Sequence, residues 1–416
     1  LASLPAGGKR KIVLIAAIVL TAAALVYCKY TNFLLDTLNV IASTGFAKLS
    51  FLDVLPLGIS YYTFKLISYT ADVYTGKVKA ERSPVVFAVY VLMYPQLIVG
   101  PIVKYRDMAD VLHQTQGRCT LQKAQDGAEM FVFGLAKKVI LADSIAALWQ
   151  DIIGTDGIGL ANASLPLAWL GIIAYSLQLY FDFAGYSEMS NGLSLMMGFE
   201  CPANFNLPYI SGSITEFWRR WHISLSSWLR DYLYISLGGN RKGKLRTYGN
   251  LLVTMVLGGL WHGAAIRFIL WGTLHGVALA LHKLWMAVVP GAKATGAQMH
   301  WWSRAAGVFF TFNLVCLGWL MFRAESMQTV ELMLHQIFSN FNVPMIPQVI
   351  AGYAGVFALI GAGYLLHLMP GCVDRAAQRL VANAPLVLQV VMAAAMIWCV
   401  MQIKSSDIQP FIYFQF

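Results

Sequence analysis

The chain has 416 residues, of which 58% are hydrophobic and only 12% are charged, with 30 Lys and Arg against 20 Asp and Glu. Soluble domains carry about 25% charged residues, so these charges are too few to cover a soluble surface. The composition indicates a polytopic membrane protein and argues against a disordered chain, a secreted disulfide scaffold and a nucleic-acid-binding protein. The six cysteines include no CxxC pair, and no metal site is predicted from them.

Long apolar runs predict the membrane helices. Residues 12–28 follow Lys9-Arg10-Lys11 and resemble a signal peptide, but the run is long for one and has no clear cleavage site. We therefore predict a transmembrane helix there. The other candidates are residues 84–103, 128–149, 166–183, 250–261, 266–285, 305–322, 350–369 and 384–403, with weaker stretches at 55–69 and 186–199. This pattern predicts an all-α, polytopic integral membrane protein of roughly nine to eleven helices, forming one domain over residues 1–416.

Proline and glycine interrupt two of these runs. The first contains Pro56 and Gly58, and the second contains Pro95, Gly100 and Pro101. Backbone groups freed inside a bilayer need partners, which favours re-entrant or cavity-lining segments here. Ordinary kinks in packed helices are the alternative.

The stretch between Pro208 and Pro290 holds four of the eight histidines. Its start, Ser213-Ile214-Thr215-Glu216, is a capping box that predicts the beginning of a helix. At 100° per residue, one arc of this helix is aromatic and apolar, with charged and small polar residues opposite. The arc contains Phe217, Trp218, Trp221, Leu225, Trp228, Leu229 and Tyr232. We expect a helix that lies in the membrane interface.

A cation-rich loop follows, with Arg241, Lys242, Lys244 and Arg246. The positive-inside rule places this loop in the cytoplasm. These cations could attract a polyanionic ligand such as the phosphates of coenzyme A. They could equally determine topology and contact lipid headgroups.

His262 lies sixteen residues after Arg246 in an apolar run. A helix covers roughly 24 Å over that distance, so His262 is expected deep in the bilayer. An ionisable side chain at that depth is a candidate for function. A buried imidazole can take a proton from a hydroxyl that attacks an acyl carbonyl. It can also simply be hydrogen-bonded to a neighbour.

Other polar residues in apolar surroundings are assigned smaller roles. His222 could line a donor passage, orient a bound group or pack at the interface. His275 and His282 are predicted to be structural because no carboxylate or cysteine completes a metal site. Asp182 and Glu188 should each have a cationic or hydrogen-bonding partner, because an unpaired buried acid is costly.

Several blocks resemble the membrane-bound O-acyltransferase family, and within it the branch that acetylates alginate and related bacterial polysaccharides. They are LPLGISYYTFKLISYTADVY (55–74), YPQLIVGPIVKY (94–105), YFDFAGYSEMSNGL (180–193), NFNLPYISGSITEFWRRWHISLSSWLRDYLYISLGGNRKGK (204–244), GGLWHGA (258–264), WGTLHG (271–276) and GWLMFRAES (318–326). The blocks cover most of the chain in family order, and the long one is highly specific.

The resemblance implies that His262 is the catalytic histidine and His222 the second histidine of the family signature. It implies no bound cofactor, acetyl-CoA as the cytoplasmic donor, and an extracytoplasmic polysaccharide or partner acetyltransferase as the acceptor. Trp261 and the loop cations are then candidate substrate-binding residues. The expected location is the bacterial cytoplasmic membrane, in contact with lipid and without nucleic acid. Family members usually begin with further hydrophobic helices, so the sequence is expected to be an incomplete view of the protein or a shorter variant.

Four other functions stay open at this point. D-alanyl transfer and peptidoglycan acetylation occur in the same family. A transporter of polysaccharide or lipid-linked sugar would need polar residues along a continuous path, whereas here they concentrate near two histidines. A scaffold for a polymer synthase would tolerate loss of His262.

Overall fold

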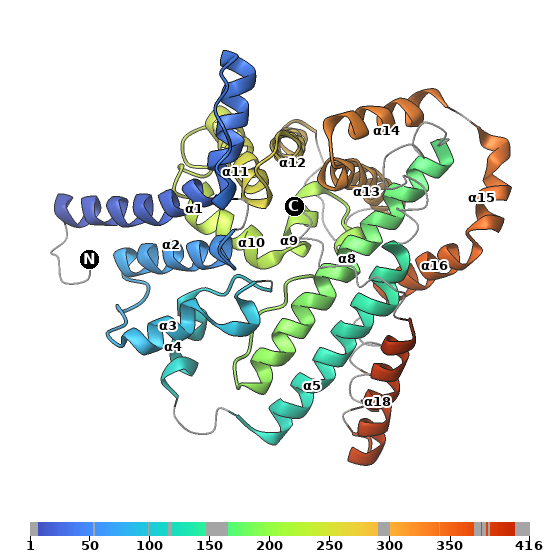
Figure 1. Cartoon of the computed structure of the whole chain (residues 1–416), viewed down its shortest axis with the longest axis horizontal. Coiled ribbons are helices and arrows are strands. Elements are labelled where there is room, and N and C mark those ends of the chain that lie inside the picture. The colour runs from blue at the N-terminus through green and yellow to red at the C-terminus, as the bar shows by residue number, and fades with distance from the viewer. Residues whose placement is uncertain are drawn as a thin grey trace.

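The computed structural model describes residues 7–52, 55–98, 100–114, 119–146, 165–289, 300–340, 342–369, 376, 380–381 and 383–403. All regular elements within these residues are helical (Figure 1). The α-helices are α1 (Gly8–Ala42), α2 (Ile59–Thr75), α3 (Pro84–Val91), α4 (Tyr105–His113), α5 (Leu121–Ala136), α8 (Leu165–Met196), α9 (Ile214–Arg220), α10 (Ile223–Trp228), α11 (Lys244–His262), α12 (Ile266–Val288), α13 (Trp301–Arg323), α14 (Met327–Ser339), α15 (Ile346–Gly352), α16 (Ala354–Leu368) and α18 (Leu386–Ile403).

The long helices α5 and α8 run side by side through the middle of the molecule (Figure 1). Two glycine pairs allow their close approach. A Cβ added at Gly134 would lie 2.5 Å from the Gly185 carbonyl, and one at Gly127 would lie 2.5 Å from the Gly192 carbonyl. Small residues at such positions let helix backbones pack tightly in a membrane. The predicted stretch 166–183 and most of the stretch 186–199 form one helix, α8, which ends at Met196.

Ion pairs fix the acids that the sequence places in apolar surroundings. Asp182 of α8 accepts from Lys138 Nζ at 2.7 Å, and Lys138 also bonds to Asp143 at 2.5 Å. Glu188 pairs with Lys137 at 2.5 Å. The two lysines stand in a π-helical turn, Lys137–Asp143, that continues α5. The prediction that both acids have cationic partners is confirmed.

Two helices of the described residues, α1 and α13, are long and apolar enough to cross a membrane. A third span is possible where Ile346–Gly352 and Phe357–Leu368 meet at a bend of 84°. The total of nine to eleven membrane helices stays a prediction, and part of the candidate span 128–149 lies outside the described residues.

The segment interrupted by Pro95, Gly100 and Pro101 is broken as expected. Helix α3 ends at Val91, a short 3₁₀ turn covers Tyr94–Gln96, and no described residue is helical from there until Tyr105. The freed Ile102 N–H donates to Ser224 Oγ at 3.0 Å, so protein satisfies the irregular backbone.

The expected interfacial helix is broken in two at His222. Helix α9 ends at Arg220, and His222 takes the left-handed conformation with φ 43° before α10 begins. Residues 204–206 cause the break, because Asn206 N–H donates to the Arg220 carbonyl and Ile223 N–H donates to the Asn204 carbonyl, each at 2.9 Å. These bonds replace those of a continuous helix.

The aromatic arc of this segment packs inside the protein. Phe217, Trp221 and Trp228 are only 1%, 2% and 6% exposed. The arc is covered by the protein itself, and the position of this segment at the membrane interface stays a prediction. The predicted helix start is confirmed, since Ser213 Oγ accepts from the Glu216 N–H at 3.2 Å. The Glu216 carboxylate accepts from the Gly212 N–H at 2.9 Å.

The loop before α3 contains a strongly hydrogen-bonded carboxylate. Glu81 accepts from Tyr105 Oη at 2.6 Å, from the Ser83 N–H at 2.7 Å, and pairs with His113 Nε2 at 2.8 Å. The Tyr105 hydroxyl, followed by the Ser83 amide, lowers the pKa of Glu81 from 4.5 to about 2.

Glu81 should stabilise the fold above its unfolded pKa near 4.5. Because the folded pKa is lower, that contribution should disappear as pH falls from about 4.5 to about 2. Glu81→Gln should flatten the acid limb of a plot of unfolding midpoint against pH. Glu200→Gln, at a carboxylate with 72% of its side chain exposed, is the control. An unchanged acid limb in Glu81→Gln would contradict this role.

Candidate active site

Trp261 joins the two predicted histidines in one cluster. Its indole lies 5.0 Å from the His262 ring and 6.2 Å from the His222 ring, measured between centroids. Trp261 and His262 are the last two residues of α11, whereas His222 stands between α9 and α10. The structure therefore brings together three of the residues that the sequence singles out.

His262 is held in an aromatic box and is 8% exposed. Trp271 of α12 and Phe322 of α13 each present an edge or face at 5.1 Å from its ring, in addition to Trp261. Gly259 and Gly263 beside it make room for Phe268 of α12. The glycines near His262 thus serve the close crossing of α11 and α12, at the end of α11 farthest from the cation-rich loop.

His222 is completely buried, and Asn204 holds its ring. Asn204 Oδ1 lies 3.1 Å from His222 Nδ1 and also accepts from the Ser224 N–H and hydroxyl, while its Nδ2 donates to Ser187 Oγ. Because Oδ1 acts as the acceptor in this network, the network assigns the proton to Nδ1. His222 Nε2 then carries a lone pair, and no described residue bonds to it.

Helix α2 covers the other side of Trp261. Phe64 stacks on Trp228 at 3.8 Å and lies 5.3 Å from Trp261, and Tyr61 meets Trp261 edge-on at 5.7 Å. The Trp228 indole N–H donates to the Phe64 carbonyl at 3.0 Å. These contacts leave Trp261 5% exposed and fix its ring between α2 and His222.

The four loop cations lie away from this cluster. Arg241 and Lys242 precede α11, and Lys244 and Arg246 stand in its first turn, all exposed. The helix places them roughly 24 Å from His262. Their role in donor binding stays a prediction.

A cavity of about 540 Å³ is walled by α9, α10, α11, α12 and the π-helical turn Leu229–Tyr234. Arg219, Arg230 and Lys283 line it together with hydroxyl groups, and no carboxylate is among the described residues of its wall. Most of its wall is apolar and includes Trp218, which lies 5.7 Å from Trp271. Trp271 in turn contacts His262, so Trp218 and Trp271 connect the cavity wall to the histidine.

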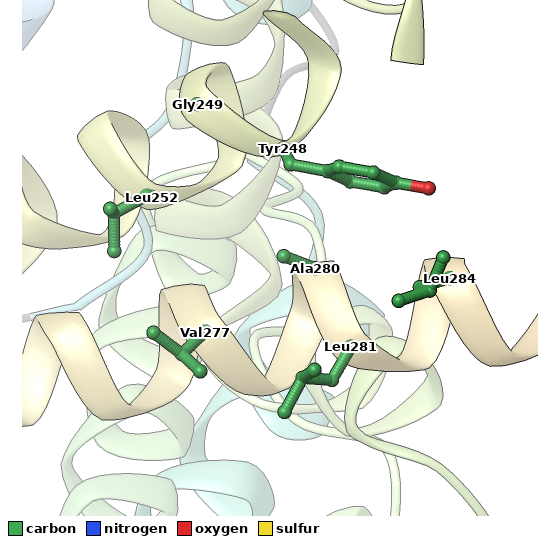
Figure 2. A pocket seen from close by; sticks show the side chains of 7 residues that line it. All are labelled: Tyr248, Gly249, Leu252, Val277, Ala280, Leu281 and Leu284. Carbon is green, nitrogen blue, oxygen red and sulfur yellow. The ribbon is translucent and has the colours of Figure 1, made fainter. Parts of the chain in front are cut away.

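A second, open groove of about 270 Å³ lies between α11 and α12, and Figure 2 shows the side chains that line it. Its wall is apolar except for the Tyr248 hydroxyl. Neither hollow is lined by His262. A passage that meets His262 from both membrane faces remains a prediction.

Some residues of this region were not singled out from the sequence. Asn204 lies in a block that resembles the family, but its bond to His222 spans 18 positions and gives no periodic signal. Arg219 and Arg230 appear only as the polar side of a helix, and Lys283 only as the neighbour of His282. Arg219, Arg230 and Lys283 become candidates because they line one cavity, and no local sequence pattern predicts that cavity.

The sequence model of the membrane-bound O-acyltransferase family matches residues 79–328. That range contains both histidines, Trp261 and the cavity, so the chain belongs to the membrane-bound O-acyltransferase family. The resemblance recognised from the sequence blocks is confirmed.

Comparison with individual relatives shows which members of the family the chain is similar to. The chain is 48% identical over 315 residues to the probable alginate O-acetylase of Pseudomonas syringae pv. tomato, covering 75% of this chain and 58% of the relative. It is 35% identical to the peptidoglycan O-acetyltransferase of Helicobacter pylori, covering 77% and 63%, and 31% identical to the teichoic acid D-alanyltransferase of Streptococcus thermophilus, covering 64% and 68%. The match thus spans about three-fifths of the length of the alginate relative.

Proposed function

We propose that the protein is a membrane O-acetyltransferase that serves the O-acetylation of an exported polysaccharide. The observation that carries the proposal is the cluster of His262, Trp261 and His222, buried within the matched family region. Identity favours polysaccharide acetylation over the two alternatives in the family, since it falls from 48% for the alginate relative to 35% and 31%. A transporter is disfavoured because the buried imidazoles gather at one point.

The proposed reaction is general-base catalysis by His262. The imidazole takes the proton of an acceptor hydroxyl while the hydroxyl oxygen attacks the acetyl carbonyl of a thioester. A C–O bond to the acceptor forms, and the C–S bond of the thioester breaks. The proton then returns from the imidazolium to the leaving thiolate. His222, with its Nε2 lone pair, orients a bound group beside Trp261.

The donor is proposed to be acetyl-CoA, entering from the cytoplasmic face. The cavity supports this choice because the three cations in its wall suit phosphates and its apolar lining suits the rest of the molecule. The acetyl group would pass to an extracytoplasmic polysaccharide or partner acetyltransferase. The protein is proposed to lie in the bacterial inner membrane as a multi-pass protein.

Loss of the cavity cations should weaken donor binding. Arg219→Gln with Lys283→Gln should raise the KM for acetyl-CoA about tenfold, because each cation offers charge-assisted hydrogen bonds to phosphate. The KM should also become less sensitive to salt. Initial rates of acetyl transfer at several ionic strengths measure both effects.

Two further cation sets make this experiment specific. Replacing Arg241, Lys242, Lys244 and Arg246 with Gln should raise the KM less, because these exposed residues can only attract the donor at a distance. The control is Lys9→Gln with Lys11→Gln, which removes the same number of positive charges as the cavity variant but from exposed residues of α1. Equal KM values in the cavity variant and this control would exclude the cavity as the donor site.

A further inference from the structure

The end of α11 lies at the candidate active site and needs hydrogen-bond donors. Gly263 has extended backbone with φ −162° and ψ 152°, and the helix stops there. The carbonyls of Leu260, Trp261 and His262 therefore lack the donors that a following helical turn supplies. In the interior of a membrane protein, water cannot be relied on to replace them.

Two consecutive residues of α1 supply these donors. The Tyr30 hydroxyl donates to the Leu260 carbonyl at 2.5 Å. Lys29 Nζ donates to the His262 carbonyl at 3.2 Å and also to the Trp261 carbonyl. Figure 1 shows α1 passing beside α11, although the two segments are more than 200 positions apart in the sequence.

The Lys29 contact is also electrostatically favourable. The C-terminal end of a helix carries a partial negative charge, and a cation placed there stabilises it. The ammonium group caps the turn that carries both Trp261 and His262. Lys29 and Tyr30 together therefore anchor the backbone from which the two rings project.

We propose that Lys29 and Tyr30 are positioning residues that hold His262 in its reactive place by capping α11. This inference rests on the proposed role of His262 as the general base. A base must lie within hydrogen-bond reach of the hydroxyl proton, and a displacement of about 1 Å can lower the rate about 10²-fold. Without its cap, the last turn of α11 can fray and move the imidazole.

A purely structural role makes a different prediction. If Lys29 only tethers α1 to the rest of the protein, its loss should reduce the amount of folded protein but not the turnover of each folded molecule. Positioning instead predicts a lower kcat with little change in the KM for acetyl-CoA, because the donor cavity is not lined by either residue.

The test uses the full-length protein, purified in detergent and corrected for the folded fraction. Lys29→Met should lower kcat about 30-fold, Lys29→Arg should restore most of it, and Tyr30→Phe should lower it about fivefold. Lys11→Met and Tyr27→Phe make the same chemical changes at exposed positions of α1. Hydrogen exchange of the peptide that contains residues 258–263 should be faster in Lys29→Met than in Lys11→Met.

The outcomes separate this inference from the proposed function. A kcat in Lys29→Met equal to that of Lys11→Met, with His262→Ala inactive, would overturn the positioning role and leave the proposed function standing. Full activity in both His262→Ala and Lys29→Met would overturn the two together. Faster exchange, a lower kcat and rescue by arginine support the positioning role.

Discussion

His262→Ala should reduce acetyl transfer by a factor of about 10² to 10⁴, because the acceptor hydroxyl loses its general base. The variant should still insert and fold, since removal of one imidazole from a large helical protein costs only a few kcal/mol. Transfer of radiolabelled acetyl from acetyl-CoA to the polymer measures the effect. His222→Ala should lose less activity, or should raise the KM for the donor.

The matched control is His335→Ala, which removes an exposed histidine of α14. Near wild-type acetylation in His262→Ala would refute the assignment of His262 as the base. It would also revive the scaffold hypothesis, which tolerates that change. If purified protein transfers no acetyl but moves the polymer, the transporter hypothesis is favoured instead.

Lys138→Met should destabilise the protein more than most single changes. Lys138 bonds to Asp182, whose side chain is 2% exposed, and to Asp143, so its removal leaves buried negative charge without this partner. Breaking a buried pair in this way costs about 3–5 kcal/mol. Thermal unfolding in detergent, followed by intrinsic fluorescence, should show a clear drop in midpoint.

The neighbouring residue provides a matched control. Lys137→Met makes the same change in the pair with Glu188, where both side chains are about one-third exposed, and should cost about 1 kcal/mol or less. The double variant Lys138→Met with Asp182→Leu should recover part of the loss, because one buried charge is removed. Equal midpoints for Lys138→Met and Lys137→Met would show that burial of the first pair has no energetic consequence.

Composition and local motifs were enough to predict the class of the protein, one helix start, one broken segment and two paired acids. Low charge and long apolar runs indicate a membrane protein because lipid admits few ionised groups. The capping box at Ser213, the broken segment near Pro101 and the need for partners at Asp182 and Glu188 were also predictable, since each follows from local hydrogen bonding or from the cost of burying charge.

The assembly of the site depends on contacts between distant segments, which are visible only in the three-dimensional structure. The helical period predicts one helix through His222, but Asn204 and Asn206 take over its backbone bonds and force the left-handed turn. The cap on α11 comes from Lys29, more than 200 positions away. Helical periodicity reports neighbours within about four residues, so contacts between distant segments leave no mark on it. The histidines could be read from the chain, whereas the residues that hold them could not.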